Sequence, residues 1–299
     1  MILEGTTSSG AVVPVQVTDD GKVVAEGMQG PEGPQGPPGP DGGAFALPPN
    51  PKNGDTLMWE NGGLVWGRPV VPVDPNTGIT WSSQASAADN NWHSVCWSPE
   101  LSLFVAVSYS GTGDRVMTSP DGITWTTQVS AADNNWSSVC WSPELSLFVA
   151  VSYSGTGDRV MTSPDGINWV TQLSAADNNW QSVCWSPELV LFVAVAETGS
   201  GNRVMTSPDG IHWTTQASAV NNPWYSVCWS PTRSLFVAVG SVGSGNRVMT
   251  SPDGIAWTTR ANAANLSWQS VCWSPERSLF VAVASSGSGN RVMISPALA

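Results

Sequence analysis

The chain is poor in positive charge. Of its 299 residues only 11 are Lys or Arg, against 23 Asp or Glu, and the only lysines are Lys22 and Lys52. A surface with this excess of negative charge repels phosphate backbones and anionic lipids. The composition therefore argues against nucleic acid and membrane surfaces as partners.

Long apolar runs are also absent. No stretch approaches the roughly 18 residues that a membrane-spanning helix needs, so we expect no membrane insertion. Residues 1–10 lack the basic and apolar regions of a secretory signal. If the protein acts outside a cell, we expect a delivery route other than a signal peptide.

Groups suited to catalysis or metal binding are scarce. The sequence has two histidines, His93 and His212, three tyrosines and five cysteines, with no CxxC pair and no Cys/His cluster. A glycoside hydrolase needs unlike carboxylates, or a Tyr–Glu pair with arginines, in one asymmetric site. Near-identical repeats would present the same groups in every copy, and each histidine is interpreted as an ordinary strand residue. We therefore expect no enzyme activity, no catalytic residues, no metal and no cofactor.

The chain does contain a 44-residue unit that occurs five times. The copies 85–128 and 129–172 are identical at 40 of 44 positions. A period of this size with several short strands per unit predicts a β-propeller with one blade per repeat. The columns that mark the period are Cys96, Cys140, Cys184, Cys228 and Cys272; Trp81, Trp125, Trp169, Trp213 and Trp257; Trp92, Trp136, Trp180, Trp224 and Trp268; and Trp97, Trp141, Trp185, Trp229 and Trp273.

Each copy predicts four strands. In the second copy the apolar runs are 136–141, 147–151, 159–162 and 167–172, and Gly, Pro, Asn and Asp fill the joints between them. In an antiparallel meander, the first–second and third–fourth joints lie on one face. The second–third joint and the joint to the next copy then lie on the opposite face.

The ends of the repeat region suggest how a ring would close. The third strand of the last copy, 291–295, is followed only by Pro-Ala-Leu-Ala, and an unpartnered fourth-strand run, 79–84, precedes the first copy. We predict that 79–84 completes the fifth blade and closes a ring of five, which would hide exposed strand edges. The expected fold class is all-β, a five-bladed β-propeller with four strands per blade.

The repeated tryptophans and cysteines are interpreted mainly as packing residues. Fully burying a tryptophan stabilises a fold by about 4–6 kcal/mol at most, and the Trp81 and Trp97 columns are predicted to lie in the core. Neighbouring blades pack about 10 Å apart, too far for a disulfide. The cysteines are therefore predicted to be small buried hydrophobes.

The first 72 residues differ from the repeats. Residues 1–26 predict a β-anchor, with a hairpin of 11–17 and 22–26 that turns at Asp-Asp-Gly. Residues 27–42 carry six glycines in triplet spacing, which favours a collagen-like triple helix and hence a homotrimer; the alternative is a Pro/Gly-rich flexible linker. Residues 43–72 predict a neck with a hairpin turning at Asn61-Gly62, and 73–299 form the predicted propeller.

The joint between the third and fourth strands resembles the Asp box of sialidase-type and other BNR-repeat propellers. In the first copy it reads Ser-Pro-Asp-Gly-Ile-Thr-Trp over 119–125, one residue shorter than the family's turn, and the run 74–78 before it lacks the aspartate position. The resemblance implies a structural role, and turn chemistry agrees, because Asp accepts backbone N–H bonds and Gly supplies positive φ. The expected Asp-box-like residues are Asp121, Asp165, Asp209 and Asp253.

The N-terminal text resembles virion appendage proteins of tailed phages that infect marine cyanobacteria. The resemblance covers about the first 45 residues. It rests on Leu-Glu-Gly-Thr-Thr-Ser-Ser-Gly over 3–10, on Ala-Val-Val-Pro-Val-Gln-Val directly after it, and on the collagen triplets. It implies that residues 1–26 dock on a phage capsid or tail protein, that the distal domain faces the host, and that the protein is on the virion surface. Near-identical blades are also similar, in architecture only, to the tachylectin type of sugar-binding protein.

A candidate glycan site lies on the face formed by the joints between copies and the second–third joints. Asn and Asp beside an exposed aromatic ring suit sugar binding; the alternative is that they only form turns and that Arg115 pairs with a carboxylate of the next blade. The candidate residues are Asp89, Asn90, Asn91, Trp92, Tyr109, Arg115, Asp133, Asn134, Asn135, Trp136, Tyr153, Arg159, Asp177, Asn178, Asn179, Trp180 and Arg203.

The sequence as a whole predicts a trimeric phage fibre whose propeller binds host surface glycan through several weak, repeated pockets. The alternative is a structural decoration of the capsid or tail that binds no sugar. The joints differ between copies at several positions, which fits either relaxed constraint or tuned specificity.

Overall fold

A computed structural model describes residues 77–295 together with the backbone of five strands nearer the N-terminus. The chain divides into two units, 1–82 and 83–299. In the first unit, β1, β2 and β3 form an antiparallel sheet and β4 pairs with β5. Their bounds are β1 (Ile2–Thr6), β2 (Val12–Val17), β3 (Val23–Val24), β4 (Thr56–Glu60) and β5 (Gly63–Gly67).

The two predicted N-terminal hairpins agree with this strand pairing, whereas the sequence did not predict β1. The collagen-like triplets of 27–42 and most of the neck lie outside the described residues, so the predicted triple helix stays a prediction. The same holds for the docking role of residues 1–26.

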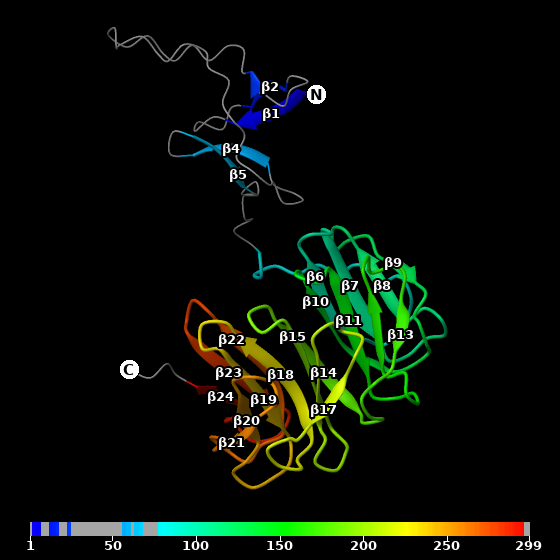
Figure 1. Ribbon diagram of the computed structural model, residues 1–299, viewed down its shortest axis with the longest axis vertical. Coiled ribbons are helices and arrows are strands. Elements are labelled where there is room, and N and C mark those ends of the chain that lie inside the picture. The colour runs from blue at the N-terminus through cyan, green and yellow to red at the C-terminus, as the bar shows by residue number, and fades with distance from the viewer. Residues whose placement is uncertain are drawn as a thin grey trace, which may run out of the picture. The chain divides into compact units, whose positions relative to one another are not determined.

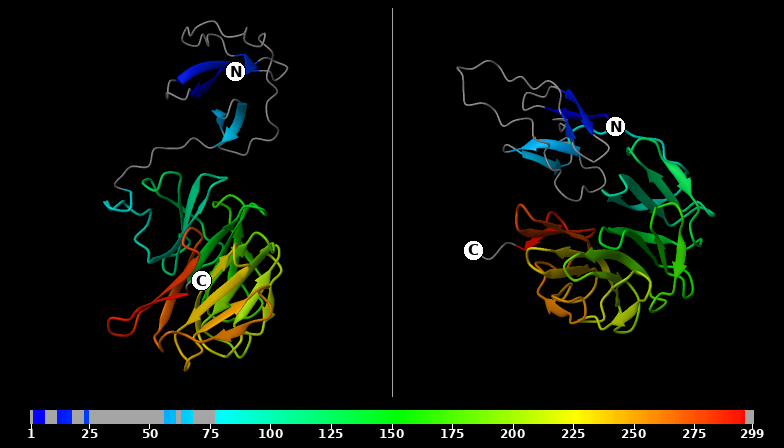
Figure 2. Two further views of the ribbon diagram at one scale, coloured as in Figure 1. Left: turned by 90° about the vertical axis from the view of Figure 1, so that its left-hand side faces the viewer. Right: turned by 45° about the horizontal axis from the view of Figure 1, so that its top comes forward.

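The second unit consists of five antiparallel sheets in sequence order, which we number blades 1 to 5. The two views in Figure 2 show them following one another around an arc, and Figure 1 labels their strands. The strands are β6 (Trp92–Ser98), β7 (Leu103–Ser108), β8 (Val116–Ser119) and β9 (Thr126–Gln128) in blade 1; β10 (Trp136–Ser142), β11 (Leu147–Ser152), β12 (Val160–Ser163) and β13 (Val170–Gln172) in blade 2; β14 (Trp180–Ser186), β15 (Leu191–Ala196), β16 (Val204–Ser207) and β17 (Thr214–Gln216) in blade 3; β18 (Trp224–Ser230), β19 (Leu235–Gly240), β20 (Val248–Ser251) and β21 (Thr258–Arg260) in blade 4; and β22 (Trp268–Ser274), β23 (Leu279–Ala284) and β24 (Val292–Ser295) in blade 5.

This arrangement fits a five-bladed β-propeller and confirms the repeat as its unit. The first strands β6, β10, β14, β18 and β22 contact one another in this order from blade to blade, so these five strands are innermost. Within a blade, each strand pairs with the one before it through a short turn. In the residues that the structure describes, no helix is long and apolar enough to cross a membrane.

Between consecutive blades lies an apolar layer. In the layer between blades 2 and 3, Phe192, Ala194 and Met205 are completely buried. The ring of Phe192 lies between Trp185 at a centroid distance of 4.4 Å and Trp213 at 6.2 Å. Trp141, Trp185 and Trp229 of the Trp97 column are therefore packing residues, as predicted, and the members of the Trp81 column after Trp81 are at least partly buried. The prediction is wrong for Trp97, which is 40% exposed. Each blade is held mainly by its neighbours.

Blade 5 corrects the predicted ring closure. Among the described residues its sheet has three strands, and β24 pairs with β23 alone. Residues 79–84 form no strand, and the side chains of Ile79 and Trp81 are 73% and 88% exposed. Every strand pair in the blades is joined by a short turn, which keeps the entropy cost of bringing its two strands together low. Pairing of 79–84 with β24 would join the two ends of the repeat region, so this pairing would not benefit from a short connection.

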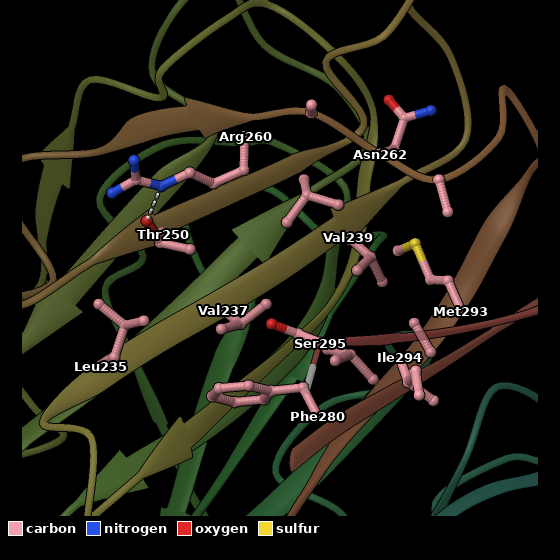
Figure 3. A pocket seen from close by; sticks show the side chains of 15 residues that line it. Leu235, Val237, Val239, Thr250, Arg260, Asn262, Phe280, Met293, Ile294 and Ser295 are labelled. Atoms are coloured by element: carbon pink, nitrogen blue, oxygen red, sulfur yellow. Dashed lines mark hydrogen bonds between the residues drawn. The ribbon is translucent and has the colours of Figure 1, made fainter. Parts of the chain in front are cut away.

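The missing fourth strand leaves a space between blades 4 and 5. A cavity of about 370 Å³ is lined there by apolar side chains from both blades, among them Leu235, Val237, Phe280 and Met293. Figure 3 shows these side chains around the cavity. On the outer strand β24, Val292 and Ile294 are 60% and 58% exposed, whereas their equivalents in blade 2, Val160 and Thr162, are buried.

The cysteines follow the same difference. All five are free thiols, and four are at least partly buried, as the sequence predicted. Burial raises the pKa of the Cys96 thiol to about 12, which keeps it protonated and unreactive. The prediction is wrong for Cys272, which is exposed, whereas each of the other four cysteines packs against the apolar layer shared with the following blade.

Candidate functional site

The Asp-box-like turns are structural in geometry. The carboxylate Oδ1 of Asp165 accepts hydrogen bonds from the backbone N–H groups of Ile167 (2.9 Å) and Asn168 (2.8 Å), and Gly166 has a φ of 74°. The indole Nε1 of Trp169 donates to the carbonyl of Gly166 at 2.9 Å. These bonds all lie within one turn, and they hold the turn that closes the β12–β13 hairpin. Asp121, Asp209 and Asp253 accept the same pair of backbone bonds.

These bonds also shift the ionisation of the aspartates. Burial raises the pKa of Asp165, but the hydrogen bonds from Asn168 and Ile167 outweigh burial and lower it to about 2. In blade 3, His212 lies in the turn rather than in a strand, and its Nδ1 is 2.7 Å from Oδ2 of Asp209. The expectation that His212 is a strand residue is therefore wrong.

The tryptophans of the candidate glycan site are not open surfaces. Trp136 and Trp180 have no exposed area, and Trp92 is partly buried. Each indole Nε1 donates to a carbonyl four residues earlier, as in the bond from Trp136 to Ala132 at 3.1 Å. The prediction that these rings cover a sugar is wrong for Trp136 and Trp180, because each of them starts an innermost strand and packs against the preceding blade. For Trp92, which starts blade 1, it stays a prediction.

The asparagines of the candidate site hold the joints together. Asn134 is 7% exposed and its Nδ2 donates to the carbonyl of Asp158 at 2.9 Å. Asn90 and Asn178 make the equivalent bonds to Asp114 and Asn202. These bonds tie the joint that enters a blade to the second–third joint of the same blade, so the two joints do lie on one face, as predicted.

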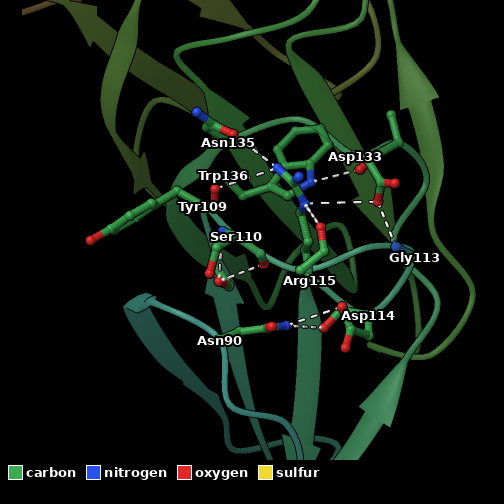
Figure 4. A network of polar contacts seen from close by, with 12 residues as sticks. Asn90, Tyr109, Ser110, Gly113, Asp114, Arg115, Asp133, Asn135 and Trp136 are labelled. Atoms are coloured by element: carbon green, nitrogen blue, oxygen red, sulfur yellow. Dashed lines mark hydrogen bonds and ion pairs between the residues drawn. The ribbon is translucent and has the colours of Figure 1, made fainter.

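A second set of contacts links neighbouring blades, as Figure 4 shows for blades 1 and 2. Asp133 Oδ1 accepts a bond from the backbone N–H of Gly113 and lies 3.7 Å from Nε of Arg115. Arg115 also donates from a terminal nitrogen to Oδ1 of Asn135 at 2.9 Å. Asp177, Arg159 and Asn179 repeat this arrangement between blades 2 and 3. The alternative interpretation, that Arg115 pairs with a carboxylate of the next blade, is confirmed.

Arg203 departs from this pattern. The residue equivalent to Asn135 is Pro223, which offers no side-chain acceptor, and a terminal nitrogen of Arg203 is buried without a hydrogen-bond partner. Its Nε donates to the carbonyl of Gly199 at 3.0 Å. Burial lowers the pKa of Arg203, and the nearby carboxylate of Glu197 opposes that shift.

Tyr109 and Tyr153 are the candidate residues that remain available. In Figure 4 the ring of Tyr109 points away from the Arg115 network. Both tyrosines follow directly after the second strand of their blade, and their ring centroids are 6.4 Å apart. Asp89 and Asn91 are exposed as well, at the joint that enters blade 1.

A β-bulge in every blade brings a second column to this place. The pairing register shifts between Trp136 and Ser138, so Ser137 is the extra residue, and the shift recurs in all five blades. Bulges re-aim side chains and recur beside functional sites. We call the two columns together the inner rim: His93, Ser137, Gln181, Tyr225 and Gln269 from the bulges, and Tyr109, Tyr153, Glu197, Ser241 and Ser285 after the second strands.

Side chains of the inner rim contact one another across blades. His93 lies edge-on to Tyr109, with ring centroids 5.7 Å apart, and its Nδ1 is 2.7 Å from the carbonyl oxygen of Ser137. In blades 3 and 4, Tyr225 donates from its hydroxyl to Glu197 Oε1 at 2.9 Å, and Gln181 donates to Oε2 at 3.2 Å. Burial and the bond to Glu197 raise the pKa of Tyr225.

The sequence analysis missed four members of this set, His93, Gln181, Glu197 and Tyr225, as candidate binding residues. A signal was present in the repeats. The bulge column has four residue types in five copies, although the residue before it is Trp and the residue after it is Ser in every copy. The sequence does not indicate the bulge, and without it these residues are typical of ordinary strand positions.

Comparisons with known proteins identify no family. No family model and no curated protein match the chain. Among solved structures, a nidogen/laminin complex is similar with a TM-score of 0.48 and 10% identity, over 65% of this chain and 76% of that one. The Swd1 β-propeller domain of Myceliophteria thermophila gives 0.44 and 13%, over 61% and 63%. An extracellular domain of a hybrid two-component system of B. thetaiotaomicron gives 0.49 and 10%, over 69% and 27%.

Proposed function

We propose that the chain is a trimeric phage virion fibre or appendage protein that attaches through its N-terminus and binds host surface glycan with its propeller. The observation that carries the proposal is the run of six in-phase glycines over 27–42 that precedes a propeller head. Only glycine fits at the axis of a triple helix. A stalk of three chains with three heads would raise avidity for a repeated surface ligand.

The head is proposed to be a recognition module rather than an enzyme. The scaffold beneath the joints is held by bonds within and between blades, as with Asn134 and Asp133. Such a scaffold leaves the side chains above it free to vary without loss of the fold. Localisation on the virion surface and docking of residues 1–26 on a capsid or tail protein belong to the same proposal.

The stalk is tested by the oligomeric state of the full chain. Wild type is expected to sediment as a trimer, and the double variant Gly33→Ala, Gly36→Ala to dissociate at a lower temperature, because a Cβ does not fit at the axis. Pro38→Ala, at a non-glycine position, is the matched control and is expected to change dissociation less. A double variant as heat-resistant as wild type contradicts the triple helix.

A structural decoration of the particle is the second candidate. It is favoured by the burial of Trp136 and Trp180 and by the bonds that occupy the Asn and Asp side chains of the joints. A particle reconstruction separates the two. A joint face turned to solvent agrees with adhesion, and a joint face buried against capsid or tail protein agrees with decoration.

A further inference from the structure

The three tyrosines of the chain share one place in the fold. Tyr109, Tyr153 and Tyr225 all lie on the inner rim, and none belongs to the buried apolar layers between blades. Tyrosine gives a large, rigid contact surface with a polar end at low cost in side-chain entropy. Gathering all of them on one rim of a repeat protein is not required by the fold, since copies 4 and 5 have serine where Tyr109 and Tyr153 stand.

The rim has two chemically different halves. In blades 1 and 2 it is aromatic, with His93, Tyr109 and Tyr153 in contact as a chain of rings. In blades 3 and 4 it is polar, with Glu197 held between Gln181 and Tyr225. The step from position 153 to position 197 is the same repeat step as from 109 to 153, so the two halves are adjacent.

Both halves suit a sugar ring. Aromatic faces cover C–H groups, while a carboxylate and an amide bond to hydroxyls. Each oxygen of Glu197 accepts one bond within the protein and can accept another. Glu197 is the one carboxylate among the ten rim residues, and the chain carries a net charge of −12, so an acidic sugar would be repelled.

We infer that the inner rim of blades 1–4 is a single asymmetric binding site for an uncharged pyranose, in place of several equivalent pockets. Tyr109 and Tyr153 stack on the sugar ring, and Glu197 and Gln181 bond to its hydroxyls. Tyr225 holds the carboxylate of Glu197 in place as a positioning residue. The inference rests on the proposed glycan binding and specifies its site and ligand class.

The repeats themselves supply variants that the fold already accommodates. Tyr109→Ser, Tyr153→Ser and Glu197→Ser each introduce the residue found at that position in copies 4 and 5, and Tyr225→Gln introduces the residue of copies 3 and 5. Matched controls are Asn168→Thr and His212→Ala, which make the same kind of exchange between copies in the exposed turns on the opposite face.

The test uses the full chain on an array of uncharged and acidic bacterial oligosaccharides. Wild type is expected to bind uncharged glycans. Glu197→Ser and the pair Tyr109→Ser, Tyr153→Ser are expected to weaken binding at least tenfold, since a hydrogen bond to a charged group contributes about 1.5–3 kcal/mol. The two controls are expected to bind as wild type does, and unchanged thermal unfolding shows that the variants are folded.

A second measurement locates the ligand without mutation. Because all three tyrosines lie on the rim, labelling the tyrosine rings with ¹³C places three reporters in the site, and the strongest array ligand is expected to shift their signals. If a glycan binds without shifting the tyrosine signals, or if the rim variants bind as tightly as wild type, the rim is not the binding site, although the protein still binds glycan. Preference for acidic glycans overturns the ligand class, and no binding on any array spot overturns both the inference and the proposed function.

Discussion

The layer between blades 2 and 3 and the layer between blades 4 and 5 have nearly the same sequence but are not equally complete. Phe192 has no exposed area and its ring lies between two tryptophan rings, whereas Phe280 is 7% exposed and has, among the described residues, the ring of Trp273 as its one aromatic neighbour. The first layer is closed by the turn before β17. The second, in which no fourth strand follows β24, contains the cavity of about 370 Å³.

The two layers also differ in one hydrogen bond. Trp185 donates from its indole to Glu144 at 2.7 Å, and Trp141 and Trp229 do the same to Glu100 and Glu188. In the last layer the equivalent acceptor position is Thr232, and Nε1 of Trp273 is buried without a partner. The apolar side chains of the two layers are thus nearly the same. The layers differ in whether a fourth strand is present and in whether the indole N–H of the tryptophan has a carboxylate acceptor.

The largest expected effect comes from removing the central phenylalanine. Phe192→Ala is expected to lower the free energy of unfolding by about 3–5 kcal/mol, and Phe280→Ala by about 1–2 kcal/mol, because Phe280 already borders a cavity. Urea denaturation of both variants measures the difference. Equal losses would mean that blade 5 is as enclosed in solution as blade 3.

The turn tryptophans test the missing strand itself. Trp213→Ala removes a side chain that packs in the layer between blades 2 and 3, and is expected to cost about 3 kcal/mol. Trp81→Ala removes a side chain that is 88% exposed, and is expected to change stability by less than about 0.5 kcal/mol. If the two variants unfold at the same urea concentration, residues 79–84 complete blade 5 in solution.

Restoring the absent acceptor is expected to repair part of the last layer. Thr232→Glu gives Trp273 the partner that Trp185 has, and is expected to raise the free energy of unfolding by about 1 kcal/mol. The reciprocal change, Glu144→Thr, is expected to lower it by a similar amount. The control compares Thr232→Glu in wild type and in Trp273→Phe. If Thr232→Glu raises the free energy of unfolding equally in both, the new carboxylate does not act through the indole of Trp273.

The smallest expected effect is on acid stability. The pKa of Asp165 is lowered to about 2 in the fold, from an ordinary value of 3.8, so its stabilising bonds are fully present above pH 4 and are lost as the pH falls through 2. The Tm of wild type is therefore expected to approach that of Asp165→Asn between pH 4 and pH 2. Asp114→Asn, in a second–third joint, is the control. A constant difference in Tm across this range would contradict the assigned ionisation.

Much of the fold could be predicted from the period and from local chemistry. The second copy predicted strands at 136–141 and 147–151, and the structure has β10 (Trp136–Ser142) and β11 (Leu147–Ser152). Each such pair is a local hairpin between invariant turns, so its signal lies within a few residues. The candidate site was less predictable, because Trp136 and Asn134 have the composition of a sugar site but make bonds within the protein.

The sequence by itself determined the number of repeats, the strands within each repeat, the faces on which the joints lie and the structural role of the turn aspartates, because all of these follow from contacts within one copy. Only the tertiary structure decided that four of the five tryptophans in the Trp92 column are fully buried, that the bulge presents His93, Gln181 and Tyr225 on one rim, and that β24 pairs with β23 alone among the described strands. These depend on how a copy packs against the next one, and a repeat that is the same in every copy carries little information about which of its polar residues that packing will cover.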